Sequence, residues 1–407
     1  MNRMVKILQR AWLVSAVVCA PALADAVIDW NIKAGDLVTE AKLNAQYATR
    51  ALTMMHAAIY EASNAITQRY PSRLKLTAPP GASVDAAIAA ASRATLLRLL
   101  PAQRNAIEAA CAAALAGLPE GPAKTDGIAV GEQAAAAMFT LRAEDLSLPA
   151  ESYRPVTTPG VYVPTVVPAV PQWPKRRPWL MATADQFRPG PPPRLDSAVW
   201  AHDFVEVKDL GAKNSTRRTA EQTEIARFWE ATLPPIYHGV VRSVAGMPGR
   251  EVTQNARLFA AITQATDDGF IAVFEAKYHY GFWRPITAIR NGDLDGNDAT
   301  DRDPSWAPFI DTPMHPEYPC AHCITASAVA TVLRAELGTG PVPRLTTTSP
   351  TAGGASRSWT SLDDFVREVS MARIYDGVHY RTSTEAAVAM GQRLGELAVA
   401  KVLRAGE

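Results

Sequence analysis

Apolar and small residues recur at helical spacing over most of the chain. Alanine has the best helix propensity, and small side chains let helices pack closely, so these stretches indicate packed helices. Patterns typical of strands are scarce. The sequence therefore predicts an all-α fold built from helical bundles. The predicted helices cover about residues 41–67, 84–99, 101–116, 124–141, 197–207, 219–232, 253–280, 320–337, 361–375 and 382–403.

One long segment, residues 147–195, departs from this pattern, with about a dozen prolines, two tryptophans and several basic residues. Such a composition predicts a loop without regular structure. Loops of this length usually serve function or wrap a surface, so we expect it to drape over the helices near the mouth of an active site. It divides the chain into an N-terminal helical part, 25–146, and a C-terminal helical part, 196–407.

The first 24 residues have the pattern of a secretory signal peptide. Three basic residues precede an apolar run over residues 11–20, and Ala22-Leu23-Ala24 fits a cleavage site. That run is too short to cross a bilayer, and no later segment reaches the roughly 18 apolar residues that a spanning helix needs. We expect a periplasmic or secreted protein without membrane attachment after cleavage; an uncleaved anchor is the alternative.

The composition excludes some classes of binding partner and limits the number of disulfides. Of 407 residues, 48% are hydrophobic and 20% charged, and the formal net charge is +1, which indicates neither nucleic acid nor an anionic membrane as partner. Any anion site must come from a local cluster. Signal cleavage leaves Cys111, Cys320 and Cys323, enough for at most one disulfide within the chain.

The first candidate cluster is Lys277-Tyr-His-Tyr-Gly-Phe-Trp-Arg284-Pro285. Two cations seven residues apart lie on one face of a continuous helix. Pro285 disfavours helical backbone at Arg284, so we expect the helix to bend there. Converging cations suit a tetrahedral oxyanion. A solvated basic face is the alternative.

The second cluster is a proline-punctuated loop, residues 315–320, that leads directly into a helix of small residues. The first backbone amides of a helix lack internal partners and, with the helix dipole, form an anion site. His322 falls in that first turn, beside any bound anion. A helix start with an incidental histidine is the alternative.

The third cluster pairs Arg373 with His379, six residues later. A continuous helix would point these side chains apart. Gly377 can end one helix, and Thr382 with Glu385 has the spacing of a capping box that starts the next. We expect the break to direct both side chains at one anion; a purely structural histidine is the alternative.

Taken together, the three clusters resemble the signature of the vanadium haloperoxidase and phosphatidic acid phosphatase type 2 superfamily. That signature reads Lys-x6-Arg-Pro, then Pro-Ser-Gly-His, then Arg-x5-His, and the order and spacings agree here. The bacterial haloperoxidase branch is also similar at residues 29–31, 54–58 and 278–291. The resemblance covers most of the chain after residue 24 and is weakest in the proline-rich segment.

The resemblance implies vanadate as cofactor and hydrogen peroxide, a halide and a small organic molecule as substrates. His379 would be the vanadium ligand, His322 the acid–base residue, and Lys277 would also polarise bound peroxide. His315, which slightly favours bromide, and Phe274 would line a halide or substrate pocket. The residues implied to surround the oxyanion are Lys277, Arg284, Cys320, Ala321, Arg373 and His379.

Two departures from the family pattern affect the chemistry. Cys320-Ala321 stands in place of Ser-Gly, and a thiol is the weaker hydrogen-bond donor. At a helix N-terminus beside cations its pKa should fall, giving a thiolate that repels oxyanions. Cys320 and Cys323 could instead form a disulfide, remain a plain substitution, or bind zinc with His322. Ser383 stands where relatives place an aspartate that orients the last histidine, and Glu385 is the candidate substitute.

We therefore interpret the chain as a vanadate-dependent haloperoxidase. A secreted acid phosphatase that forms a phosphohistidine at His379 is one alternative. A non-catalytic oxyanion-binding protein, or a redox protein using the Cys-x2-Cys pair, is another. The halide, the organic substrate and the oligomeric state stay open, and a homo-oligomer is compatible with the sequence.

Overall fold

The computed structural model describes residues 25–146 and 148–404, so the predicted signal peptide, 1–24, lies outside the described residues. The all-α prediction is confirmed, because the described part consists of helices with one two-stranded antiparallel hairpin. The N-terminal helices are α1 (Ala26–Glu40), α2 (Ala45–Thr67), α3 (Val84–Leu99), α4 (Arg104–Ala116) and α5 (Pro122–Leu141). The others are α6 (Ala198–Leu210), α7 (Ala220–Trp229), α8 (Pro235–Ala245), α9 (Val252–Tyr280), α10 (Pro285–Arg290), α11 (Ala321–Leu337), α12 (Leu362–Tyr375) and α13 (Arg381–Ala398), and the strands are β1 (Leu345–Thr348) and β2 (Ser356–Trp359).

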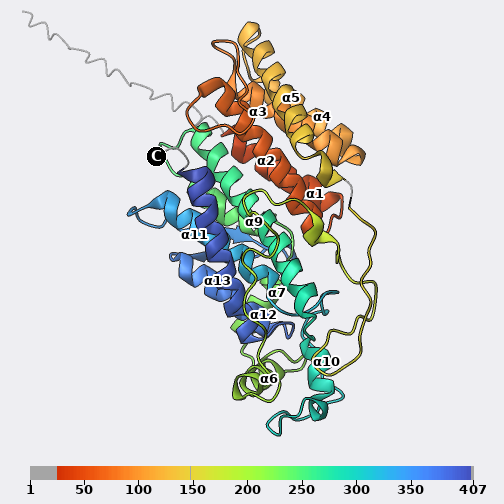
Figure 1. Ribbon diagram of the computed structural model, residues 1–407. Helices are drawn as coiled ribbons and strands as arrows, with labels where there is room; N and C mark the ends of the chain where they lie inside the picture. Colours follow the sequence, from red (N-terminus) through yellow and green to blue (C-terminus); the bar gives the residue numbers. More distant parts are fainter. Residues whose placement is uncertain (1–24, 147, 405–407) are drawn as a thin grey trace, which may run out of the picture.

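Helix α9 runs through the middle of an elongated molecule (Figure 1). On one side it packs against α2, which in turn packs on α3 and α5. On the other side it packs against α11 and α13, and α12 packs on α11. Helices α6 and α10 lie at the end opposite the N-terminal helices (Figure 1). One buried apolar cluster spans residues from α1 to the C-terminal turn, so the two helical parts share a core.

Helices α1, α8 and α10 and the hairpin were not predicted from the sequence. Helix α8 begins directly after Pro234, with Pro235 in its first turn, where a proline costs no hydrogen bond. In the sequence these prolines resemble loop punctuation. Helix α1 is capped by the Asp25 carboxylate, which accepts from the amides of Val27 and Ile28.

The contact between α11 and α13 depends on a close approach of their backbones at Gly391. A Cβ atom at this position would lie 2.3 Å from the carbonyl oxygen of Ile324, closer than packed atoms allow. Glycine therefore permits α13 to lie directly on α11. This contact matters for function because the candidate site lies between the N-terminal ends of these two helices.

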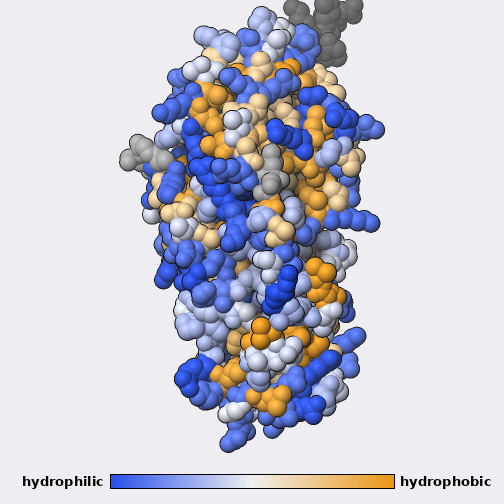
Figure 2. Space-filling model, turned by 45° about the vertical axis from the view of Figure 1, so that its right-hand side comes forward, coloured by the Kyte–Doolittle hydropathy of each residue, from blue (hydrophilic) through white to orange (hydrophobic). Residues whose placement is uncertain are grey.

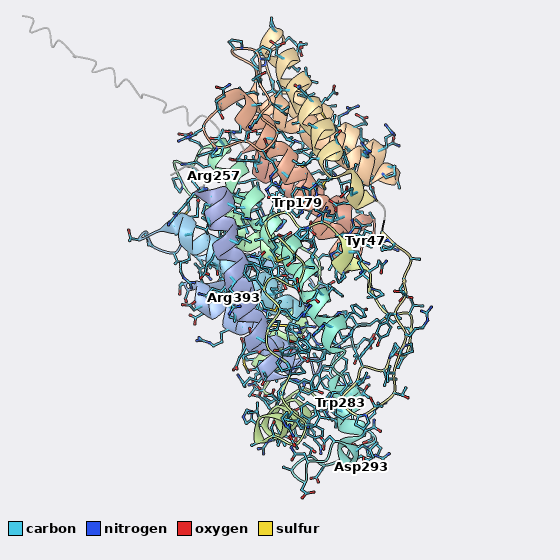
Figure 3. All side chains as sticks on the ribbon, in the orientation of Figure 1. Tyr47, Trp179, Arg257, Trp283, Asp293 and Arg393 are labelled. Atoms are coloured by element: carbon cyan, nitrogen blue, oxygen red, sulfur yellow. A yellow bond between two sulfur atoms is a disulfide. The ribbon has the colours of Figure 1, made fainter. Side chains whose placement is uncertain are left out.

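Over its described residues, 148–195, the proline-rich segment lacks regular structure, as predicted, except for a 3₁₀ turn at Trp173–Lys175. It is anchored on α9, because Asp268 accepts the backbone amides of Trp179, Leu180 and Met181. Figure 3 shows Trp179 between the N-terminal helices and the middle of the molecule. Burial raises the pKa of the Asp268 carboxyl to about 6. The segment also reaches the loop before α11, where the Ala169 amide donates to the Met314 carbonyl over 2.6 Å.

A second, smaller apolar cluster closes the end of the molecule that carries α6 and α10. Its centre is Trp200, whose indole ring stacks on Trp283 and meets Tyr380 edge to face. Trp283 and Tyr380 directly adjoin Arg284 and His379 in the sequence. The label of Trp283 in Figure 3 marks this end of the molecule. The cluster therefore anchors the backbone on which two predicted site residues stand.

The face drawn in Figure 2 shows hydrophobic patches interspersed with hydrophilic residues. Among the described residues, no helix is both long and apolar enough to cross a membrane.

Candidate oxyanion site

Lys277 and Arg284 do not lie on one helix, contrary to the prediction. Helix α9 ends at Tyr280, and Gly281 follows with a left-handed backbone, φ 58°. Arg284 has an extended backbone and is the N-cap of α10. The prediction of a helix that merely bends at Arg284 is wrong, because glycine at 281 ends it first.

The loop before α11 brings the two cations together. The Lys277 ammonium donates to the carbonyls of Pro316, over 3.1 Å, and Glu317, over 2.7 Å. The Arg284 guanidinium donates through Nε to the His315 carbonyl over 2.9 Å, and its Nη2 lies 2.9 Å from His315 Nδ1. Three consecutive loop residues thus orient both cations, which are almost fully buried.

Arg373 and His379 are brought together by the break between α12 and α13, as predicted. Gly377 has φ 77°, and a Cβ there would lie 2.3 Å from the Gly211 carbonyl oxygen, so this turn requires glycine. Arg373 donates to the Trp229 carbonyl and forms an ion pair with Asp376 over 2.6 Å. His379 Nε2 lies 3.4 Å from Arg284 Nη1.

The predicted capping box at the start of α13 is absent. The helix begins at Arg381 with Tyr380 as N-cap and no side-chain cap, one residue before Thr382. The Thr382 amide donates instead to the Asp203 carboxylate of α6 over 3.1 Å. A tertiary contact therefore replaces the local cap that the Thr382/Glu385 spacing suggested.

The acid that orients His379 is Glu317, a role that the sequence did not reveal. Its Oε1 lies 2.6 Å from His379 Nδ1 and also accepts the Tyr380 amide over 3.2 Å. Ser383 Oγ lies 3.4 Å from the same ring nitrogen, whereas Glu385 is exposed to solvent and is not the orienting acid. Glu317 is 62 residues away in the chain, and only the fold places it there.

The N-terminal turn of α11 adds His322 and a disulfide. Cys320 is the N-cap and is disulfide-bonded to Cys323, while Cys111 is a free, buried cysteine. Cys320 therefore does not act as a thiol donor or thiolate in this state, contrary to one prediction. Zinc is not supported, because no cluster of three or more metal-binding side chains occurs among the described residues. His322 is half-buried, with Nε2 3.3 Å from the Ala231 carbonyl oxygen.

A cavity of about 70 Å³ joins these parts. The predicted site residues that line it are His315, Ala321, His322, Arg373 and His379. Lys277, Arg284 and Cys320 are buried and are not among the lining residues. Phe274 is buried and holds the His315 ring edge to face, with 5.1 Å between ring centres, so it supports the cavity wall.

The electrostatics of the cavity favour a bound anion. Three cations are buried against two carboxyls, and burial raises the pKa of both Glu317 and Asp376 to about 7. Burial, reinforced by the neighbouring Arg284, lowers the pKa of Lys277 well below its usual value. The buried Arg373 Nε has no hydrogen-bond partner among the described residues. An oxyanion would satisfy this donor and offset the excess positive charge.

Burial is also the main cause that lowers the pKa of each histidine around the cavity, and nearby cations lower it further. This applies to His315, His322 and His379. All three are therefore neutral near pH 7, and each has one unprotonated ring nitrogen. Neutral imidazole is the form that binds metals, accepts protons and attacks phosphorus.

Comparison with known proteins places this geometry in a family. Residues 257–406, which contain all the cavity cations and His379, match the model of the VCPO second helical-bundle domain. This match covers most of α9 and the elements that follow it. The chain is 28% identical over 260 residues to vanadium chloroperoxidase of Curvularia inaequalis. That match covers 50% of this chain and 42% of the relative, so the chain spans less than half of the relative's length.

Solved structures show the same fold beyond the second bundle. A bacterial vanadium-dependent iodoperoxidase superposes with a TM-score of 0.77 at 24% identity, covering 92% of this chain and 94% of that one. A holo-type bacterial vanadium-dependent chloroperoxidase superposes with a TM-score of 0.71 at 19% identity, covering 91% and 96%. The predicted relationship to the vanadium haloperoxidases is confirmed, and the haloperoxidase fold extends through the N-terminal helices.

Proposed function

We propose that this protein is an exported vanadate-dependent haloperoxidase, which oxidises a halide with hydrogen peroxide. The observation that carries the proposal is the orientation of His379. An ionised Glu317 can only accept a hydrogen bond, so the ring proton lies on Nδ1 and the lone pair on Nε2. That nitrogen faces Arg284 beside the cation-rich cavity.

The residues present fit vanadate. His379 Nε2 would bind vanadium, and a carboxylate behind a ligating imidazole is a usual way to hold its tautomer. Lys277, Arg284 and Arg373 would neutralise the oxygens, and the Arg373 Nε donor has no partner within the described part of the chain. The amide of Ala321, at the start of α11, would donate a further hydrogen bond. The chemistry that bound vanadate supplies is Lewis-acid activation of hydrogen peroxide without a change of oxidation state.

His322 would move the proton of the peroxide. Its Nε2 is within hydrogen-bond distance of the Ala231 carbonyl, so in the neutral ring the proton lies there and Nδ1 is the base. Lys277 would polarise the peroxide; its ammonium is held by the carbonyls of Pro316 and Glu317, which follow the cavity residue His315. His315, backed by Phe274, would contact the halide or the organic substrate.

A secreted acid phosphatase is the second candidate, favoured by the same unprotonated Nε2 of His379. A neutral histidine oriented by a carboxylate can attack phosphorus, and His322 can protonate the leaving group. For both candidates we propose export after cleavage behind Ala24. We also propose residues 25–146, 147–195 and 196–407 as the N-terminal helical part, the proline-rich segment and the part that carries the site.

The experiment that tests the proposal uses purified protein from Asp25 onward, loaded with vanadate. Peroxide-dependent oxidation of iodide, bromide and chloride is measured by triiodide formation or by halogenation of monochlorodimedone. Hydrolysis of p-nitrophenyl phosphate is measured in parallel, with and without vanadate. Oxidation of at least one halide supports the haloperoxidase. Phosphoester hydrolysis inhibited by vanadate, without any halide oxidation, would establish the phosphatase instead.

A further inference from the structure

A second and larger cavity, of about 460 Å³, lies beside the candidate oxyanion site. Its walls come from α1, from the connection between α7 and α8, from α8 and from the turn after β1. Thr232 lines both cavities and is exposed. The neighbouring Ala231 lines the larger cavity and supplies the carbonyl that His322 contacts. The two cavities therefore share Thr232 as a lining residue.

The polar anchor of this larger cavity is Arg242, on α8. Its Nη1 donates to the Asn31 side-chain oxygen over 2.7 Å. No carboxylate among the described residues lies within ion-pair distance of it; Asp36 and Glu230 also line the cavity. Since a guanidinium has five N–H donors, most of them stay available to a ligand.

Asn31 is itself held by two buried histidines that take no part in the proposed reaction. Its side-chain nitrogen lies 3.0 Å from His56 Nε2 and 2.9 Å from His238 Nδ1. Burial lowers the pKa of His56 to about 3 and that of His238 well below its usual value, so both rings are neutral and can accept these hydrogens. The two histidines thus fix the side-chain amide of Asn31, and this amide fixes the guanidinium of Arg242.

The remaining lining is mixed, with threonines, Asp36 and Glu230 beside apolar side chains that can pack on a flat ring. Side chains of Leu233, Pro235 and Ile236 come from the connection and the start of α8. Ile32 from α1 and Pro350 after β1 lie at the cavity as well. Pockets that combine apolar side chains with a few placed polar groups typically bind small organic molecules, and the polar groups set their orientation.

We propose that this cavity binds the organic acceptor of the reaction, an electron-rich aromatic carboxylate such as a hydroxybenzoate. The carboxylate pairs with Arg242, and the ring packs on the apolar lining next to Thr232. The role as acceptor rests on the proposed haloperoxidase function; the binding does not. In the transfer, a hypohalous acid and an aromatic C–H give an aromatic C–halogen bond and water. The ring supplies the electron pair, and the displaced proton joins the hydroxide of the hypohalous acid.

Binding is tested on vanadate-free protein with 4-hydroxybenzoate, by titration calorimetry in saturating inorganic phosphate, which occupies the oxyanion site. We expect binding that phosphate does not displace. Phenol lacks the carboxylate, and its affinity should be lower by about 10-fold or more, because a charged hydrogen-bonded pair contributes about 1.5–3 kcal/mol. Equal affinity for phenol and 4-hydroxybenzoate, or displacement by phosphate, would overturn the proposal.

Variants separate the anchor from the shape of the cavity. R242Q should weaken 4-hydroxybenzoate binding by about 10-fold or more, and R242K by less, because the charge remains. T39W places a large ring at the exposed rim without touching the Asn31 network and should also weaken binding, which keeps the test valid if R242Q fails to fold. R334Q, at an exposed arginine of α11, is the matched control and should bind as the parent does.

The outcomes separate this inference from the proposed function. If T39W and a folded R242Q bind 4-hydroxybenzoate as tightly as the parent, the site is wrong, whatever the halide assay shows. If both variants weaken binding but no halide is oxidised, the result supports the carboxylate-binding site and contradicts its role as the acceptor site. If both weaken binding and the loaded enzyme halogenates the bound ring, site and role are supported together.

Discussion

Two groups of buried histidines in this protein differ in their partners. His379 has a carboxylate, Glu317, on one ring nitrogen and cations beside the other. His56 and His238 share the amide of Asn31. Burial lowers the pKa of all three, so burial alone does not distinguish a reactive histidine from a structural one. The partner does, because a carboxylate makes the far nitrogen a better ligand or nucleophile, whereas an amide only fixes the ring.

The largest expected effect comes from removing the ligand histidine. His379→Ala should lower halide oxidation, or phosphoester hydrolysis, by about 10³-fold or more, because the bond to the reacting centre is lost. The rate is measured with vanadate and peroxide at saturating halide. His202→Ala, at an exposed histidine of α6, is the control and should keep the parent rate. A His379→Ala variant within tenfold of the parent would exclude His379 from the chemistry.

The second-largest effect is expected from changing Glu317, whose carboxylate contacts Nδ1 of His379. Glu317→Gln should weaken vanadate binding by about 10- to 100-fold, the usual range for a partner of a metal ligand. Binding is followed by ⁵¹V NMR or calorimetry and needs no turnover. Adding Ser383→Asp should restore part of the affinity, because Ser383 Oγ already lies 3.4 Å from His379 Nδ1. A merely structural Glu317 would not be rescued from position 383.

The amide-held histidines should affect stability as a function of pH. His56 has a folded pKa of about 3 against an ordinary 6.5, so between these values the unfolded chain binds one proton more. The free energy of unfolding should therefore fall as pH drops from about 6.5 to about 3, by up to about 1.4 kcal/mol per pH unit for this group. His56→Asn should remove that contribution to the slope. Urea unfolding at several pH values measures it, and an unchanged slope would contradict the assignment.

The smallest effect concerns the disulfide at the start of α11. Cys323→Ser leaves a single thiol at Cys320, at a helix N-terminus near the cavity cations, where its pKa should fall. We expect phosphate affinity to drop a few-fold above the thiol pKa, through repulsion between the thiolate and the anion. The double variant Cys320→Ser/Cys323→Ser should bind phosphate as the parent does. If the single variant binds phosphate as tightly as the double one at every pH, a thiolate is not the cause.

Much of the helical framework was predictable, because alanine-rich periodic stretches depend mainly on local preference. The bounds predicted for α3, α9 and α11 agree with the structure to within about one residue. Helices α1 and α8 were missed, and the cap of α13 was predicted two residues late, at Thr382 instead of Tyr380. At α8, prolines at the helix start resemble loop punctuation, and at α13 a contact from Asp203 replaces the local cap.

The spacings of the motifs along the sequence determined which cations and histidines were grouped together. The residues that follow the family signature are Lys277, Arg284, Arg373 and His379. Only the tertiary structure decided how they are oriented. Glu317, not Ser383 or Glu385, holds His379, and the loop at residues 315–317 holds both Lys277 and Arg284. The carboxylate and the carbonyls reach the site from distant parts of the chain, and no local periodicity encodes such contacts. The same holds for Arg242, whose orientation depends on Asn31, 211 residues away.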